Sequence, residues 1–526
     1  MTLRRALLVL AVLAATVLSG AAQPQRFDLL IRHGRILDGT GNPWMLGDIG
    51  IRGDRIAALG RLDGATATRV IDATGLIVAP GFIDVHSHAG PGLQTPALHQ
   101  GIPVIAQGIT TVLVNPDGGG PTDLAGQRAA LEQGGIGPNV ALFVPHGSVR
   151  RAVMNMTDRD PTPDDLQKMR ALVRAGMEAG AVGLSSGLYY APGSYSKTAE
   201  VVELAKVAAA YHGVYASHIR DEADYTVGVV AAVQEVIDVA EQAGLIGVVT
   251  HMKALGPASH GLSATLVRNI EAARARGVEV FADQYPYEAS GTSITGALVP
   301  RWAQVFGRDA FLRRAKGDDR DRLLGDMRTN IARRGGADTL MVSRFAPDPS
   351  IEGRTLADLA TTAGRSPEET ALDLVTRDET GLVSFNMSEG DIERIMRQTW
   401  TMTCTDGDLV PMGEGKPHPR AYGAFPRKIR LYVEERGVVD LPFAVRSMTS
   451  LPATVFGLAD RGVLRAGAFA DVLVFDPASL RDTATYQDPH QLAVGIQWAV
   501  VNGQLVRADG RPTEALPGRV LAPRRR

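Results

Sequence analysis

The sequence predicts an α/β protein: a (β/α)8 TIM-like barrel with a small β-sandwich domain built from both chain ends. Three observations predict it. The middle of the chain alternates short apolar runs with amphipathic helical segments, both ends are rich in β signals, and polar residues close most of the apolar runs. A chain of 526 residues is also too long for one small core, which favours a large domain plus a smaller one.

The barrel is predicted from eight apolar runs of strand length that end in polar residues. Helical segments such as 198–211 and 224–243 separate most of them, with apolar residues three and four positions apart. Eight strands in this alternation predict closure into a barrel. The predicted strands are 82–88, 110–117, 140–146, 181–186, 214–218, 247–251, 278–285 and 401–406.

The chain ends carry short β runs broken by glycine and aspartate turns. A simple arrangement pairs the two ends in one domain, with the barrel inserted between them. We expect residues 23–78 and 456–526 in this domain, residues 79–455 in the barrel, and an insertion at about 301–400 that adds helices and a lid-like segment. Residues 383–386 are a candidate for an additional strand.

Composition limits the class of protein. Hydrophobic residues make up 45% and charged residues 21%, as in soluble globular proteins, and a net charge of -2 gives no electrostatic case for binding nucleic acid or an anionic membrane. Cys404 is the only cysteine, so no disulfide can form within the chain.

The first 22 residues have the order of a secretory signal peptide. Arg4 and Arg5 precede an apolar run at 6–18, and small residues at 19–22 offer a cleavage site near Ala22. The run is short for a membrane span. We therefore expect a periplasmic or secreted protein with no membrane attachment after cleavage; an uncleaved N-terminal anchor is the alternative.

Six potential metal ligands follow the predicted strands. His86 and His88 lie two positions apart, so on a strand their side chains point the same way. Active sites of such barrels lie at the carboxyl ends of the strands, where ligands from distant positions converge. The pattern therefore predicts a mononuclear or dinuclear metal site. The six residues are His86, His88, Asp117, His218, His251 and Asp406.

The motifs resemble the amidohydrolase superfamily, and within it the N-acyl-D-amino-acid deacylase (D-aminoacylase) family. The first motif below is typical of the superfamily, and the D-Q-Y-P-Y and H-P-R-A-Y-G-A-F-P-R pair is more specific to the deacylases. This resemblance implies a metal-dependent amide hydrolase of small molecules, with zinc as the usual metal. The motifs are P-G-F-I-D-V-H-S-H (80–88), G-I-T-T-V-L-V (108–114), A-S-H-I-R-D-E (216–222), T-H-M-K (250–253), D-Q-Y-P-Y (283–287), T-D-G (405–407) and H-P-R-A-Y-G-A-F-P-R (418–427).

The sequence departs from this family at Asp117, which stands where the family typically has a cysteine ligand. A carboxylate is a harder ligand than a thiolate, so Mn²⁺ or Co²⁺ would compete better with Zn²⁺. Asp117 could instead be a turn residue before three glycines. The fourth strand also lacks the lysine that many superfamily members carbamylate, which leaves Asp117 as the evident bridge between two metals.

The resemblance also implies roles. With this ligand set, a bound divalent metal lowers the pKa of its water to about 7, and Asp406 would take the proton and pass it to the leaving amine as the catalytic residue. Asp406 could instead be purely a ligand or a salt-bridge acid. Asp117, His218 and His251 would hold the tighter metal, and His86, His88 and Asp406 a second one. Lys253, Tyr285 and Arg420 would surround the substrate carboxylate, although Lys253 and Arg420 could instead be structural ion-pair partners.

Other residues have weaker assignments. Possible helpers are Ser290, Thr292 and Ser293. His146 and Arg150 line the pocket, support it from behind, or are core packing residues. Arg344 or Arg354 in the insertion could favour an acidic side chain. Two other functions stay open: the same machinery acting on a dipeptide, a cyclic amide or a lactone, and a non-catalytic metal-binding barrel protein. The sequence does not indicate an oligomeric state.

Overall fold

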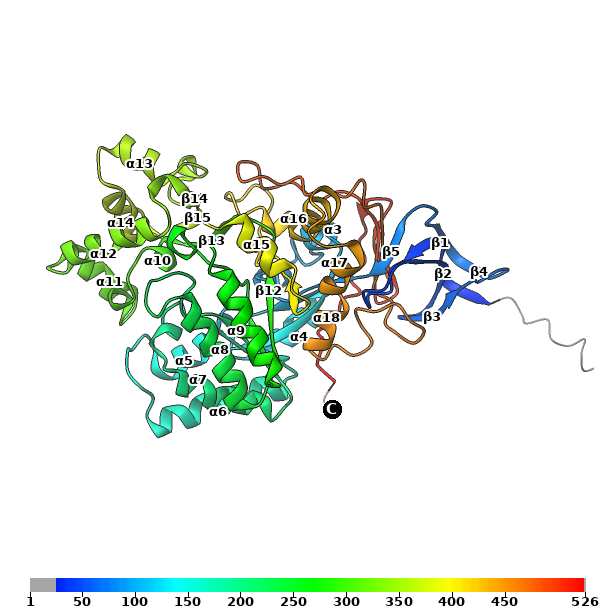
Figure 1. The fold of residues 1–526 in the computed structure, drawn as a ribbon, viewed down its shortest axis with the longest axis horizontal. Helices are drawn as coiled ribbons and strands as arrows, with labels where there is room; N and C mark the ends of the chain where they lie inside the picture. Colours follow the sequence, from blue (N-terminus) through cyan, green and yellow to red (C-terminus); the bar gives the residue numbers. More distant parts are fainter. Residues whose placement is uncertain (1–24, 525–526) are drawn as a thin grey trace, which may run out of the picture.

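The structure is a computed structural model, and it describes residues 25–524. The predicted signal peptide at 1–22 lies outside the described residues. Eight strands in parallel pairs form the central sheet in sequence order, which confirms the predicted barrel (Figure 1). The strands are β6 (Phe82–Asp84), β7 (Ile109–Val114), β8 (Asn139–Pro145), β9 (Gly183–Gly187), β10 (Val214–His218), β11 (Gly247–Val249), β12 (Val280–Gln284) and β16 (Thr401–Thr403).

The first and last barrel strands, β6 and β16, are joined through Asp84. Its Oδ1 accepts a hydrogen bond from the Thr405 backbone N–H (2.9 Å), and its Oδ2 accepts one from the Thr405 hydroxyl (2.5 Å). The Asp406 N–H also donates to the carbonyl of His86 (2.9 Å). These bonds fix the segments that follow β6 and β16 side by side at one mouth of the barrel.

Helices cover the outside of the barrel, because each buries an apolar face against the barrel strands. In α8 (Val229–Ala243), the buried residues recur at three and four spacing from Val229 to Ala240. Gly244 ends the helix in the left-handed conformation, at φ 68°. The other covering helices are α3 (Ile102–Ala106), α4 (Leu124–Gly134), α5 (His146–Met154), α6 (Pro163–Glu178), α7 (Thr198–Ala209), α9 (Ser263–Ala275), α15 (Glu389–Met396), α16 (Arg420–Arg427), α17 (Leu441–Met448) and α18 (Ser450–Val455).

The prediction that this helix begins at residue 224 is wrong by five residues. The Asp221 carboxylate accepts hydrogen bonds from the backbone N–H groups of Ala223, Thr226 and Gly228, which closes residues 221–228 into a loop. A local acceptor of this kind competes with the helical hydrogen bonds.

The two ends of the chain pair in a second sheet, as predicted. β17 (Val472–Phe475) lies antiparallel to β5 (Ile77–Pro80), with Val474 opposite Val78, so a strand from the C-terminal part of the chain completes a sheet begun by the N-terminal part. In Figure 1 this sheet lies at the opposite end of the molecule from the insertion. Its strands are β1 (Arg26–Ile36), β2 (Met45–Arg52), β3 (Arg55–Gly60), β4 (Thr66–Asp72), β5 (Ile77–Pro80), β17 (Val472–Phe475), β18 (Ile496–Val501), β19 (Gln504–Ala508) and β20 (Arg511–Pro512).

A third unit lies between β12 and β16, and it has its own apolar core that includes Leu298, Met327 and Leu382. The additional strand predicted near residue 383 is present as β15, in a three-stranded sheet. The elements of this unit are β13 (Ala289–Ser293), α10 (Ile294–Ala297), α11 (Arg308–Lys316), α12 (Arg320–Arg333), β14 (Leu340–Arg344), α13 (Leu356–Ala363), α14 (Pro367–Arg377) and β15 (Gly381–Phe385).

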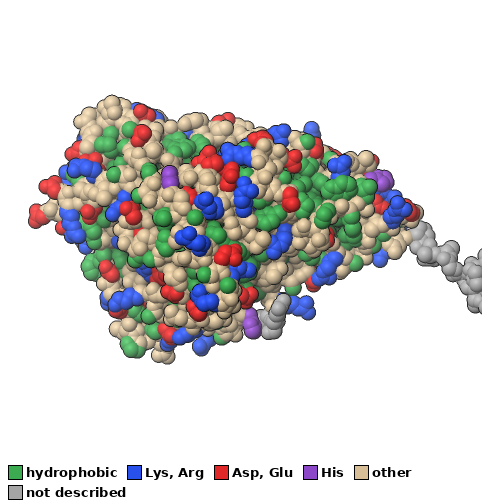
Figure 2. Space-filling view, viewed as in Figure 1, with side chains coloured by type: hydrophobic (Ala, Val, Ile, Leu, Met, Phe, Trp, Pro, Cys, Tyr) green, Lys and Arg blue, Asp and Glu red, His purple; other side chains and the backbone are tan. Residues whose placement is uncertain are grey.

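The surface carries both signs of charge. Figure 2 shows basic and acidic side chains interspersed over the face in view, with no large region of one sign. Among the described residues, no helix is both long and apolar enough to cross a bilayer.

Lys428, just after α16, is a buried ammonium whose pKa burial lowers to about 7. It donates to the hydroxyls of Thr403 and Ser447, both at 2.8 Å, and Cys404 is the nearby titratable group. The pKa of an unfolded lysine is about 10.4. Between the two values the unfolded chain binds one more proton, so this group makes stability rise with pH. Below pH 7 the folded lysine is also charged, so the free energy of unfolding is reduced by the full cost of burying that charge.

We therefore expect Lys428→Met to raise the thermal-unfolding midpoint at pH 6 and to lose more than half of that advantage by pH 9. The cost removed at low pH is roughly 5 kcal/mol, from the difference between the folded and unfolded pKa values. Ser447 still has a partner without the lysine, since it donates to the Ala444 carbonyl. Thermal unfolding at pH 6, 7.5 and 9 measures it, with Lys206→Met on the exposed face of α7 as the control. A gain that is the same at every pH would contradict the assignment.

Candidate functional site

The six candidate metal ligands all lie at one mouth of the barrel, in segments that continue from the carboxyl ends of strands. Three of them have backbones in the left-handed region: Asp117 (φ 55°), His251 (φ 34°) and Asp406 (φ 49°). This conformation is unfavourable for residues other than glycine and clusters at functional sites. The fold therefore holds these three side chains in place at a cost in backbone energy.

The Asp117 carboxylate is the centre of the cluster. Oδ1 lies 3.2 Å from His86 Nε2, 3.5 Å from His251 Nε2 and 3.6 Å from His218 Nδ1, while Oδ2 lies 3.3 Å from His88 Nε2. Asp117 therefore belongs to two groups whose ligand atoms lie within 4.8 Å of one another. The first contains His86, His88, Asp117 and Asp406, and the second contains Asp117, His218 and His251.

Small residues on β9 allow the Asp117 loop to approach. The Ser185 hydroxyl donates to the Asn115 carbonyl (2.6 Å) and accepts from the Gly118 N–H (3.2 Å). A Cβ on Gly187 would lie 2.2 Å from the Asp117 carbonyl oxygen, so a larger residue there would displace the loop. β9 is the fourth barrel strand, which the sequence analysis found to lack a lysine. Its small residues thus hold the loop that carries Asp117.

Glu222 is a site residue that the sequence analysis missed. It is buried, and its Oε1 lies 2.5 Å from Lys253 Nζ and 3.2 Å from His251 Nδ1. His251 Nδ1 also lies 2.7 Å from Lys253 Nζ, which can only donate, so this bond runs from Lys253 to Nδ1. The tautomer that turns the Nε2 lone pair towards Asp117, as in ligand histidines, needs Nδ1–H to donate to Glu222 instead, across 3.2 Å. Burial alone would raise the pKa of Glu222, but the Lys253 ammonium and the neighbouring imidazoles hold it well below its usual range.

Asp406 faces the histidines of its ligand group on one side and Arg420 on the other. Its Oδ1 lies 3.2 Å from His88 Nε2, and its Oδ2 lies 2.7 Å from Arg420 Nη1. Burial would raise the pKa of Asp406, yet the Arg420 guanidinium and the imidazoles hold that pKa well below its usual range. The carboxylate is therefore ionised and fixed in orientation.

The three predicted substrate-binding residues lie together. The Tyr285 ring has the Arg420 guanidinium at 4.7 Å and the Lys253 ammonium at 5.5 Å from its centroid. All three residues line the cavity at the barrel mouth. Both cations also pair with an acid, Lys253 with Glu222 and Arg420 with Asp406, so each is an ion-pair partner and also lines the cavity.

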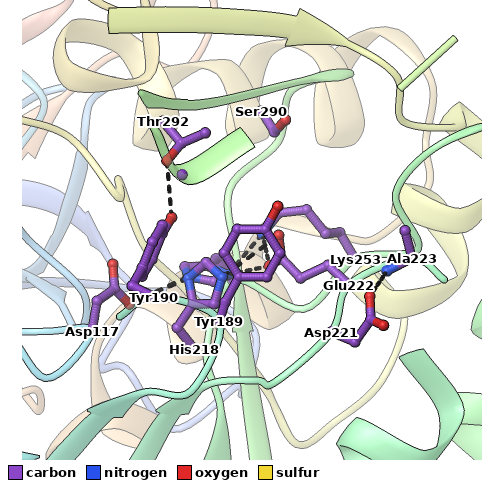
Figure 3. A network of polar contacts seen from close by, with 12 residues as sticks. Asp117, Tyr189, Tyr190, His218, Asp221, Glu222, Ala223, Lys253, Ser290 and Thr292 are labelled. Atoms are coloured by element: carbon purple, nitrogen blue, oxygen red, sulfur yellow. Dashed lines mark hydrogen bonds and ion pairs between the residues drawn. The ribbon is translucent and has the colours of Figure 1, made fainter. Parts of the chain in front are cut away.

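A cavity of about 910 Å³ opens over the ligand cluster. Two further lining residues, Tyr189 and Tyr190, were missed by the sequence analysis; their rings lie 5.3 and 4.7 Å from the His218 ring. Figure 3 shows Tyr190 reaching across to Thr292, where the two hydroxyls are 3.0 Å apart. Only the neighbouring Y-Y pair after β9 could have signalled them, and aromatic pairs are common in cores.

Some of the residues with weaker sequence assignments line the cavity, and others do not. Ser290, Thr292 and Ser293 on β13 and Arg344 on β14 line the cavity, although Arg344 is exposed and pairs with Glu414. Arg354 instead bonds to the Thr362 hydroxyl on the surface of the insertion and does not line the cavity. The pocket alternative for His146 and Arg150 is wrong, since neither residue lines the cavity. Both are buried against Glu200, whose carboxylate pairs with the imidazole and neutralises the guanidinium.

The sequence matches the family model described as "Amidohydrolase family" over residues 69–507. The chain belongs to the amidohydrolase family. N-acyl-D-glutamate deacylase of Alcaligenes xylosoxydans xylosoxydans is 37% identical, with 94% of this chain and 97% of the relative covered. D-aminoacylase of the same organism is 35% identical, with 95% and 98% covered.

Solved structures agree with these relatives. N-acyl-D-glutamate deacylase of Bordetella bronchiseptica, complexed with zinc and a phosphonate inhibitor that mimics the tetrahedral intermediate, superposes with a TM-score of 0.80 at 37% identity. A D-aminoacylase crystal structure superposes with a TM-score of 0.81 at 33% identity. In both cases 94% of this chain and all of the other chain are covered. The predicted family is thereby confirmed.

Glu222→Gln is expected to weaken metal binding. The neutral amide no longer compensates the Lys253 charge and orients His251 less firmly, and losing such an outer partner typically costs about 10- to 100-fold in metal affinity. Zinc competition against a chelator of known affinity measures it. Glu200→Gln is the matched control, a buried acid that holds His146 and Arg150 instead. Equal zinc affinity in the wild type and Glu222→Gln would refute this role.

Proposed function

We propose that the protein is a metal-dependent hydrolase that cleaves the amide bond of N-acyl-D-amino acids to a carboxylate and a free D-amino acid. The observation that carries the proposal is the cluster of four imidazoles and two carboxylates at the mouth of a barrel. Relatives that match nearly the whole chain support it, because their names are N-acyl-D-glutamate deacylase and D-aminoacylase.

The donor set suits a divalent cation. His86 Nε2, His218 Nδ1 and Asp117 Oδ1 are buried and form no hydrogen bond within residues 25–524, and buried polar atoms rarely stay unsatisfied. Asp117, His218 and His251 would hold one ion, and His86, His88, Asp117 and Asp406 a second. We propose zinc, which one related crystal structure contains. Such an ion supplies Lewis-acid activation of water and of the scissile carbonyl.

Asp406 acts as general base and acid. Arg420 fixes Oδ2, which leaves Oδ1 facing the imidazoles of the first group. Oδ1 accepts the proton of the attacking water and then passes it to the leaving amine nitrogen. Lys253, Tyr285 and Arg420 bind the substrate carboxylate and thereby place the amide carbonyl beside Asp406.

The proposal predicts amine release from N-acetyl-D-methionine, -leucine or -glutamate but not from the L forms. A chelator should abolish the activity and zinc should restore it. Asp406→Asn should lower kcat about 10²- to 10⁴-fold, because proton transfer is lost, whereas Asp373→Asn, an exposed aspartate of α14 outside the cavity lining, serves as the control. No release from either series by protein with bound metal would sink the proposal.

Asp117 provides a test of metal choice. Asp117→Cys should raise the affinity for Zn²⁺ relative to Mn²⁺, because a thiolate is the softer ligand. Competition titrations of the two ions on wild type and variant measure the ratio, and Ser87→Cys, close by but outside both ligand groups, controls for adding a thiol. An unchanged ratio would mean that Asp117 is not a ligand.

We also propose that the mature protein begins near residue 23 and acts in the periplasm or outside the cell. The support is the order of charged, apolar and small residues at 4–22.

A further inference from the structure

Arg334 is a cation of the cavity wall that has no acidic partner. It follows α12, is 2% exposed and lines the cavity. Its Nε donates to the Tyr225 hydroxyl (2.8 Å), Nη1 to the Ser384 hydroxyl (2.9 Å) and Nη2 to the Tyr189 hydroxyl (3.2 Å). These partners orient the guanidinium, but hydroxyl groups do not neutralise it.

Three other deeply buried arginines are paired, whereas Arg507 bonds to the Ile496 carbonyl and lies outside the cavity lining. Arg150 pairs with Glu200, Arg420 with Asp406 and Arg461 with Asp471, whereas no carboxylate of residues 25–524 lies within 4.0 Å of Arg334. A buried charge without a counter-charge is costly. An uncompensated guanidinium in a cavity wall is therefore suited to a ligand that brings the negative charge.

The acid that attracts Arg334 most, Glu222, lies beyond 4.0 Å and is bonded to Lys253. This wall of the cavity thus holds two cations for one carboxylate. The excess positive charge is available to an anionic group of the substrate.

Arg334 also lies apart from the groups assigned to the α-carboxylate. It comes from the insertion between β12 and β16, and one tyrosine links it to the ligand cluster, since Tyr189 bonds to it and packs on His218. Lys253, Tyr285 and Arg420 form their own cluster. We propose that Arg334 binds a carboxylate on the side chain of the substrate, so that the enzyme selects acidic N-acyl-D-amino acids. This inference rests on the proposed function.

The guanidinium keeps capacity for such a ligand. It has five N–H donors, of which the three hydroxyls use one on each nitrogen. One N–H therefore remains on Nη1 and one on Nη2, and such a pair can grip a carboxylate with two parallel hydrogen bonds.

The test compares N-acetyl-D-glutamate with N-acetyl-D-glutamine, which has the same shape but a neutral side chain. The wild type should favour the glutamate substrate, and Arg334→Gln should lower the ratio of the two kcat/KM values about 10- to 100-fold. Arg334→Lys keeps the charge and should retain part of the ratio, which covers the case in which Arg334→Gln folds poorly. Arg333→Gln is the control, an adjacent arginine that pairs with Asp224 outside the cavity.

An equal loss on both substrates, or a wild type without preference for the acid, would overturn the inference. Failure of the proposed function looks different, because the wild type would then hydrolyse neither substrate. In that case the binding of D-glutamate and D-glutamine to the metal-loaded protein, measured by calorimetry, decides whether Arg334 forms the side-chain subsite. Tighter binding of D-glutamate that disappears in Arg334→Gln supports the subsite, and equal binding rejects it.

Discussion

The barrel mouth is arranged around one carboxylate, that of Asp117, which faces four imidazoles from three separate segments of the chain. A short side chain can reach all four only if its backbone comes close to the barrel axis. The left-handed backbone of Asp117, the bonds from Ser185 and the missing side chain of Gly187 together permit that approach. The geometry of both ligand groups depends on this loop, since Asp117 is the residue that they share.

Around this centre, charge balance explains the outer residues. Glu222 and Asp406 each face imidazoles on one side and a cation on the other. Lys253 and Arg420 therefore serve two roles that the sequence presents as alternatives. They keep the carboxylates ionised and oriented, and they present positive charge to the cavity. Under the proposed function, a substrate carboxylate that approached them would share this charge with an acid already in place, which favours discrimination over raw affinity.

The sequence predicts the parts of this arrangement that follow from the barrel strands. The predicted strand 82–88 is too long, because β6 ends at Asp84, and strand alternation therefore does not place His86 and His88. They follow β6, His218 ends β10, and the other candidate ligands follow β7, β11 and β16, so the barrel rule is sufficient to bring them together. Glu222, Tyr189 and Arg334 follow from no such rule. Glu222 is four residues beyond His218 but in a loop, and its contact with Lys253 arises from packing of two separate strand ends. Arg334 ends a helix of the insertion, where arginine is common and no local pattern shows which residue turns inward.

This difference reflects how the two units are built. The barrel strands fix the metal ligands and Asp406, whereas the insertion has a separate apolar core and reaches the cavity through β13, β14 and the end of α12. Because the cores are separate, residues of the insertion can change without moving the ligands, as long as β13 and β15 stay paired. The barrel thus carries the ligand groups, and the insertion contributes part of the cavity wall that faces them. Arg334 joins the two units, since it bonds to Ser384 on β15 and to Tyr189, which packs on a barrel histidine.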